Sequence, residues 1–175
     1  MTTFATDTNW AQSAEIFLGR VHILDTPEGT ENLKGDTGHS VHLSRFNDAS
    51  GQAISGQSDW LVAGQQKPAY AFRFLFHSRS SDRLHFMITG SGADHDKTVG
   101  VSRNGYLGLY KYASVSDYIK IEPLLWSTDT VVCRLRDHLG NIVRTHHDPE
   151  APPRFSYLRV NHGKEVIFHI ERVRS

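Results

Sequence analysis

The sequence predicts an all-β fold, and three observations support this prediction. Apolar and polar residues alternate over short runs, as they do in strands that bury one face. Gly, Pro, Asn, Asp and Ser interrupt these runs every few residues, which is typical of turns. Apolar spacing of the helical kind is scarce, and the runs echo one another along the chain. The chain is therefore expected to consist of strands and turns.

Each alternating run is predicted to form a strand, because apolar side chains recur at every second position and turn residues mark the ends. In chain order the runs are Ile16 to Leu24, Ser40 to Arg45, Trp60 to Ala63, Tyr70 to Phe76, Arg83 to Thr89, Thr98 to Arg103, Tyr106 to Tyr110, Tyr118 to Leu124, Thr130 to Arg136, Asn141 to Thr145, Phe155 to Val160 and Val166 to Val173. Asn104-Gly105 joins two of them and suits a tight turn with positive φ. The proline-rich segment 148–154 is predicted to be a loop.

An internal repeat relates these runs. The closing apolar residues Phe74, Ile121 and Ile170 follow one another at intervals of 47 and 49 positions. Ile88 and Leu135, near the ends of two other runs, are also 47 positions apart. The repeat divides the chain into three units of four strands, at about 14–78, 79–126 and 127–175, with extra loop residues in the first unit.

Three units of four strands resemble the β-trefoil, in which six strands close a short barrel and six hairpin strands cap one end. The resemblance covers nearly the whole chain and lies in the repeat pattern. It implies a single β-trefoil domain over 14–175, preceded by a flexible arm over 1–13. Three such units can share one core and hide their strand edges. A β-sandwich of similar strand count is the alternative.

Composition bounds the partners. Lys and Arg number 19 and Asp and Glu number 19, so the basic surplus of a nucleic-acid-binding protein is missing. No apolar run is long enough to predict membrane insertion. The first ten residues lack a basic region followed by an apolar run, so the expected location is cytoplasmic, or outside the cell by a route without a cleavable signal peptide. A homo-oligomer is compatible with the sequence.

The sequence offers no catalytic constellation, and the protein is predicted not to be an enzyme and to need no cofactor. Motifs for a serine nucleophile elbow, a phosphate-binding loop or a zinc protease are missing. Asp94-His95-Asp96 and Thr145-His146-His147-Asp148 come nearest to metal ligands, but neighbouring strand residues point to opposite faces, so no metal site is predicted. Cys133 lies in an alternating run and is expected to be a buried small apolar residue.

The resemblance to ricin-type β-trefoil lectins implies carbohydrate binding. Such a unit holds its sugar with an Asp after the first strand, an aromatic platform on the third and an amide soon after. A carboxylate and an amide bind vicinal hydroxyls, while an aromatic face covers the apolar side of the sugar ring. The predicted sites are Asp137, Tyr157, Asn161 and His162 in the third unit, Asp94 and Tyr106 in the second, and Asp25 and Trp60 in the first.

The chain departs from that family in one respect. The Gln-x-Trp motif of ricin-type units is missing, and Phe72, Ile119 and Phe168 occupy the corresponding strands. A lectin that recognises glycans or glycoproteins through shallow surface sites is the predicted function. A protease inhibitor that presents a protruding loop, with Arg154 behind two prolines, is the alternative. A cytoskeletal or scaffold interaction module is the third.

Overall fold

The computed structural model describes residues 16–24, 38–44, 60–64, 68–111, 118–127, 129–146 and 155–173. Within these ranges the chain forms strands, and its helical content is the short 3₁₀ helix η2 (Gly92–Asp94). The strands are β1 (Ile16–Leu24), β2 (Gly38–Ser44), β3 (Trp60–Gly64), β4 (Ala71–Arg79), β5 (Leu84–Thr89), β6 (Thr98–Val101), β7 (Leu107–Tyr110), β8 (Ile119–Trp126), β9 (Thr130–Arg136), β10 (Arg144–His146), β11 (Phe155–Arg159), β12 (Lys164–Glu165) and β13 (Ile167–Val173). The predicted all-β class is confirmed, and every predicted run overlaps a strand. Among the strands of the described ranges, only the two-residue β12 falls outside the predicted runs.

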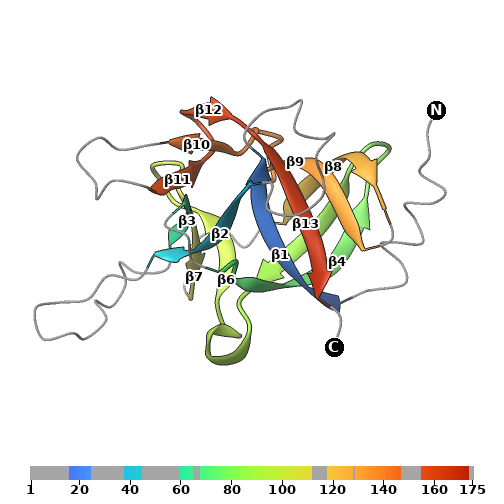
Figure 1. The fold of residues 1–175 in the computed structure, drawn as a ribbon, viewed down its shortest axis with the longest axis horizontal. Coiled ribbons are helices and arrows are strands. Elements are labelled where there is room, and N and C mark those ends of the chain that lie inside the picture. Colours follow the sequence, from blue (N-terminus) through green and yellow to red (C-terminus); the bar gives the residue numbers. More distant parts are fainter. Residues whose placement is uncertain are drawn as a thin grey trace, which may run out of the picture.

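All strands belong to one sheet that closes on itself (Figure 1). Antiparallel pairing runs from β3 through β2, β1, β13, β9, β8, β5 and β6 to β7, and β7 pairs again with β3. Nine strands thus form a closed antiparallel β-barrel. Strand β4 pairs with both β1 and β5 and closes a shorter ring through the longer strands. Strands β11, β10 and β12 extend the sheet from β3.

This topology corrects the predicted β-trefoil and its alternative, the β-sandwich: the fold is a closed nine-strand barrel. The prediction separates six barrel strands from six capping strands. In the structure hydrogen bonding continues through both sets, because β2 and β6 pair with the long strands β1 and β5, while β3 and β7 pair with each other. Closure leaves fewer exposed strand edges, which are costly to leave unpaired.

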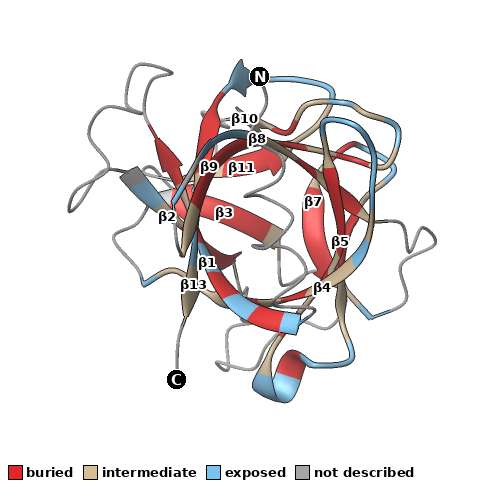
Figure 2. Cartoon of the chain, turned by 90° about the vertical axis from the view of Figure 1, so that its right-hand side faces the viewer, coloured by how far each residue is buried: buried red, intermediate tan, exposed pale blue. Residues whose placement is uncertain are grey.

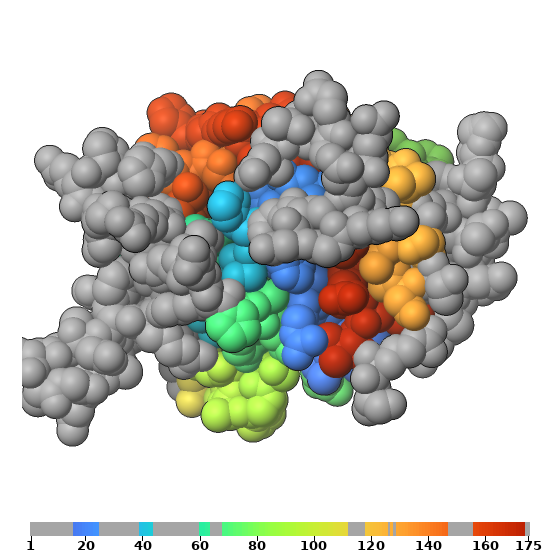
Figure 3. Space-filling model, in the orientation of Figure 1, coloured from blue at the N-terminus to red at the C-terminus, as the bar shows by residue number. Residues whose placement is uncertain are grey.

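The two ends of the described chain are adjacent strands of the barrel. β1 and β13 pair over seven residues, from Leu18 opposite Val173 to Leu24 opposite Ile167. Figure 3 shows them side by side on the surface, β1 in blue and β13 in red. The first and last described strands are therefore neighbours within the barrel, and the β7–β3 pairing completes the ring.

The strands of the barrel carry many buried residues (Figure 2), and the buried cluster at its centre is apolar. Phe17 and Phe74 stack with ring centroids 4.9 Å apart, and Phe86 meets both rings edge on. Gly19 makes room for this stack, since a Cβ there would lie 2.8 Å from the ring of Phe74. The repeat positions Phe74, Ile121 and Ile170 are all fully buried in this core. Period-two alternation therefore identified core residues correctly.

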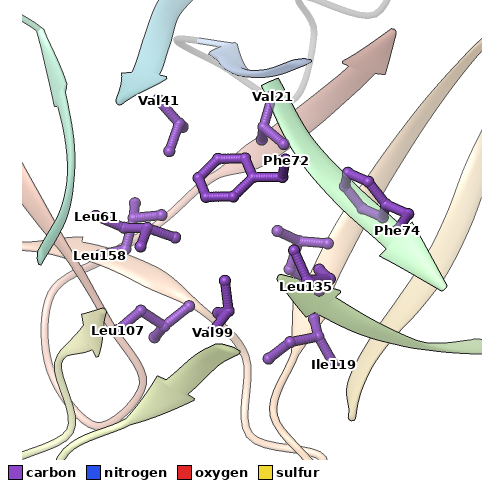
Figure 4. A pocket seen from close by; sticks show the side chains of 11 residues that line it. Val21, Val41, Leu61, Phe72, Phe74, Val99, Leu107, Ile119, Leu135 and Leu158 are labelled. Carbon is purple, nitrogen blue, oxygen red and sulfur yellow. The ribbon is translucent and has the colours of Figure 1, made fainter. Parts of the chain in front are cut away.

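A small void lies in the core (Figure 4). Its volume is about 20 Å³, and its lining is entirely apolar. One side of the void is bounded by residues of β2, β3, β6, β7 and β11, which are Val41, Leu61, Val99, Leu107 and Leu158. An apolar void of this size offers water no hydrogen bonds and is expected to be dry.

Candidate functional site

An aromatic cluster lies on the outward face of strands β3, β7 and β11. Trp60 is opposite Gly108, and Val62 is opposite Tyr157. Residues two apart in a strand share a face, so Trp60, Val62 and Tyr157 lie on one face. Tyr106, two residues before Gly108, packs against the same group. We call Trp60, Tyr106 and Tyr157 the aromatic cluster.

The three rings of the aromatic cluster fix one another. Trp60 and Tyr106 are stacked with centroids 6.0 Å apart and an interplanar angle of 19°. Tyr157 meets both edge on, 5.6 Å from Trp60 and 5.5 Å from Tyr106. Offset stacks and edge-to-face pairs are the favoured aromatic geometries. Tyr157 is buried while Trp60 and Tyr106 are only partly so, and it therefore supports two rings that reach the surface.

Arg159 lies against this cluster. Its Cζ is 4.6 Å from the centroid of the Tyr106 ring, within the range of a cation–π contact. Its Nη1 donates to the Tyr106 hydroxyl at 3.2 Å, and its Nε donates to Asn161 Oδ1 at 2.9 Å. The guanidinium is thus held in one orientation by an aromatic ring and an amide.

The turn of the β6–β7 hairpin places Tyr106 at the cluster. Gly105 has φ of +90°, and its N–H donates to Ser102 O at 2.9 Å. The predicted Asn104-Gly105 turn with positive φ is confirmed. Asn161 Nδ2 donates to Asn104 O at 3.4 Å, and Val160 N donates to Gly105 O at 3.0 Å. The turn is therefore docked on the end of β11.

Two histidines extend the site along β10 and beyond β11. His146 is opposite Tyr157, and its ring centroid is 6.4 Å from that of Tyr106. His162 follows Asn161, and its ring centroid is 6.5 Å from that of His146. His162 is exposed, and its Nδ1 is 2.9 Å from Asn161 O. Imidazoles thus border the aromatic cluster on this side.

Tyr110 lies beside Trp60, because its ring covers Gly108, the residue opposite Trp60. A Cβ at Gly108 would lie 2.5 Å from the Tyr110 ring. Burial raises the pKa of the Tyr110 hydroxyl, and hydrogen bonding with Ser102 and Trp60 opposes that rise. Tyr110 therefore stays a neutral phenol at ordinary pH.

The structure brings together predicted residues from all three units. Trp60, Tyr106 and Tyr157 were predicted in three separate sites, but they form a single cluster. Asn161 touches the same cluster through Arg159, and His162 lies next to His146. Residues assigned to separate sites in the three units thus lie side by side in one aromatic cluster.

The Asp137 side chain forms its hydrogen bonds within the turn after β9, which it stabilises, and not with the aromatic cluster. Its Oδ1 accepts hydrogen bonds from Leu139 N at 3.0 Å and Asn141 N at 2.8 Å. Its Oδ2 accepts from Asn141 Nδ2 at 3.1 Å, and the residue is only 3% exposed. Such a side chain caps the backbone, as Asp often does in turns. These three hydrogen bonds and the burial of the residue leave the carboxylate little capacity to bind a sugar hydroxyl.

Asp94 has a comparable structural environment. Its Oδ2 accepts a hydrogen bond from the Tyr70 hydroxyl at 2.9 Å, and Lys97 Nζ lies 3.4 Å from its Oδ1. Asp94 is 8% exposed and belongs to η2, which closes the loop between β5 and β6. Asp25, the third predicted carboxylate, lies outside the described residues.

Arg159, Arg144 and His146 are the residues that the sequence prediction missed. Arg159 follows Tyr157 by two positions, so strand alternation alone places both on one face. Arg144 is opposite Arg159, and His146 is opposite Tyr157. The alternation was visible in the sequence, but the pairing of β10 with β11 was needed to assemble these side chains.

A separate group of side chains, which we call the second polar cluster, lies on the outside of the barrel and consists of His77, Ser78, His85 and Tyr118. Ser78 Oγ is 2.7 Å from His77 Nδ1 and 2.9 Å from His85 Nδ1. Tyr118 stacks on both imidazoles, with centroids 4.8 Å from His77 and 4.7 Å from His85. A β-bulge between Phe76 and Ser78 allows adjacent residues to share this face. His85 lies between the core residues Leu84 and Phe86, so it is on the outer face of β5, and it is buried there beneath the stacked ring of Tyr118.

Other chemistry has little support within the described residues. Among them no group of three or more His, Cys, Asp or Glu side chains could hold a metal ion. Cys133 is fully buried, as predicted, and burial raises the pKa of its thiol far above the usual range. Its reactivity as a thiolate is correspondingly suppressed. In the part of the chain described here, no helix has the length and apolar character that crossing a lipid bilayer demands.

Comparison with known proteins gives no relative: no family model, no curated protein and no solved structure matches this chain.

Proposed function

We propose that the protein binds carbohydrate through the aromatic cluster and the polar side chains beside it. The observation that carries the proposal is the stacked, partly exposed pair of Trp60 and Tyr106 with Arg159 and Asn161 at its edge. Aromatic rings cover the apolar C–H face of a sugar, while guanidinium and amide groups bind its hydroxyls. The aromatic cluster together with Arg159 and Asn161 supplies both kinds of contact in one place.

The rigidity of the site supports the proposal. Tyr157 holds the two outer rings from below, and Asn161 and Tyr106 hold the guanidinium of Arg159. Groups that are already fixed lose little conformational entropy when a ligand binds. A shallow site of this size is expected to bind one sugar with a Kd in the millimolar range, about −4 kcal/mol. Copies displayed together would gain avidity.

The loops that carry the protease-inhibitor alternative, including Arg154, lie outside the described residues. No described contact favours the third candidate, a scaffold interaction module. Carbohydrate binding is therefore the function that the described side chains support best.

A glycan array probed with the labelled, multivalently displayed protein tests the proposal. We expect hits for the native protein and their loss in Trp60→Leu. Tyr118→Leu is the matched control, because Tyr118 is an aromatic residue of the second polar cluster and should leave the hits unchanged. Near-UV circular dichroism confirms that both variants fold. A blank array for the folded native protein, or hits that persist in Trp60→Leu, would reject carbohydrate binding at this cluster.

A further inference from the structure

Two arginines face each other beside the aromatic cluster. Arg144 in β10 is directly opposite Arg159 in β11, and paired residues of antiparallel strands project from the same face. Like charges in this position repel each other. The juxtaposition is unfavourable for the protein alone, and it becomes favourable when an anion lies between or above the two groups.

Among the described residues, no carboxylate forms an ion pair with either arginine. Glu165 in β12 is opposite Arg144 in β10, but its carboxylate pairs with another arginine: its Oε1 lies 3.3 Å from Arg134 Nε. Because acidic and basic residues are equal in number over the whole chain, the excess positive charge here is local.

Arg159 is prepared for an anion by its own contacts. Its Nε donates to Asn161 and one Nη1 hydrogen donates to Tyr106. A guanidinium carries five N–H donors, so three remain, two of them on Nη2. A fixed guanidinium fork matches the geometry of a carboxylate or sulfate group and binds it with two parallel hydrogen bonds.

We propose that the site selects acidic glycans, in which a carboxylate or sulfate group pairs with Arg159 and Arg144 while a sugar ring packs on Trp60 and Tyr106. This inference rests on the proposed carbohydrate binding and adds its ligand class. Arg159 packs against the ring of Tyr106 and is the cross-strand neighbour of Arg144. The groups that would bind the anion and the rings that would bind the sugar face therefore lie next to each other in one site.

Calorimetric titration with matched probes tests this selectivity. The carboxylate probe is an oligogalacturonate, the sulfate probe is a dextran sulfate oligomer, and the neutral probes are a cello-oligosaccharide and dextran of equal length. We expect the acidic probes to bind at least about tenfold more tightly than the neutral ones and to weaken as NaCl is raised. A preference between the two acidic probes identifies the anionic group.

Charge-removing variants locate the effect. Arg144→Gln and Arg159→Gln should each lower the affinity for the acidic probe about fivefold or more, and Arg159→Lys should behave like Arg159→Gln because the fork is lost. Arg73→Gln on β4 removes the same charge elsewhere and should leave binding unchanged. The side chain of Arg144 forms no hydrogen bond or ion pair with the described residues, so Arg144→Gln tests the inference even if Arg159 variants fold poorly.

The outcomes separate the two proposals. Equal affinity for neutral and acidic probes, with no effect of Arg144→Gln, overturns acidic selectivity while binding itself stands. Failure of all carbohydrate probes overturns both. Inorganic polyphosphate serves as a polyanion that has neither a sugar ring nor an aromatic base that could stack on Trp60. If it binds as tightly as the acidic glycans, the site responds to charge alone and the inference fails.

Discussion

Asn161 occupies the space that a side chain at Gly105 would need: its Oδ1 lies 2.5 Å from the position of a Cβ there. Gly105 belongs to the β6–β7 turn and Asn161 follows β11, so their contact docks this turn on the end of β11. The same asparagine accepts the hydrogen bond that orients Arg159. The turn and the candidate site are therefore coupled through one side chain.

Gly105→Ala is predicted to destabilise the protein and to displace Asn161. A non-glycine residue at φ of +90° is strained by about 1–2 kcal/mol, and the clash adds to that cost. Gly92→Ala is the matched control, because Gly92 has φ of +57° and nothing lies within 4 Å of its Cβ position. Urea denaturation should show a larger loss for Gly105→Ala. Equal losses would mean that backbone strain alone matters and that Asn161 moves aside freely.

Asp137→Ala is predicted to lower the free energy of unfolding by about 2 kcal/mol and to leave glycan binding intact in the folded protein. The substitution removes the acceptor for two backbone N–H groups of the turn. Asp82→Ala is the control, because Asp82 is exposed and its ion pair with Arg83 is long at 3.8 Å. Chemical denaturation measures both variants. A stable Asp137→Ala that no longer binds glycan would restore Asp137 to the binding site.

The strands were predictable because their signal is local. Each strand exposes alternate residues to core and surface, and Asn104-Gly105 is specified by turn chemistry within a few residues. The ring closure through Trp60 and Gly108 was not predictable, and neither was the attachment of β11 to β3 through Tyr157 and Val62, since both pairings join residues far apart in sequence. Pairings of that kind leave no trace in periodicity.

The same limit explains the candidate site. The sequence singled out Trp60, Tyr106 and Tyr157 as binding residues but gave each to a different unit, because sequence distance separated them, whereas the structure packs the three rings together. Asp137 was chosen for its chemistry, while its contacts show that the carboxylate is used by the turn. Residue type indicates what a side chain can bind, and only tertiary pairing decides what it does bind.

Val99→Ile is predicted to stabilise the protein by up to about 1 kcal/mol. The substitution adds one methylene, and burying a methylene is worth about 0.8 kcal/mol where space exists. Val99 lines the apolar void of about 20 Å³, which provides part of that space. The midpoint of urea unfolding measures the change. A decrease would show that the void cannot accept the added group without strain.

Leu61→Ala tests the same void from the opposite direction. Leu61 is buried and lines it, so truncation enlarges the cavity and should cost about 2–5 kcal/mol. The double variant Leu61→Ala with Val99→Ile should recover part of that loss, because the added methylene fills space that the truncation opens. Strictly additive effects would place the two side chains in independent environments.

The unfolding free energy is predicted to fall as pH drops below about 7, in part through His85. Burial lowers the pKa of His85 below its ordinary value of 6.5, and the charges of Lys120, His77 and Arg83 lower it further. The folded state therefore binds fewer protons than the unfolded state near pH 6, so stability rises with pH in this window. The stabilisation is fully present above the unfolded pKa and is lost as pH falls through the lower folded pKa. The Nε2 of His85 has no hydrogen-bond partner among the described residues, so a proton added there gains no compensating contact.

Urea denaturation at several values between about pH 8 and pH 5 measures this dependence. His85→Gln should flatten part of the slope, because the glutamine cannot take up a proton in the unfolded state. His95→Gln is the control, since His95 is exposed and lies in the loop after η2. His169, whose pKa is lowered by burial and by His22, should account for a further share of the slope. An unchanged slope in His85→Gln would show that His85 titrates alike in the folded and unfolded chain.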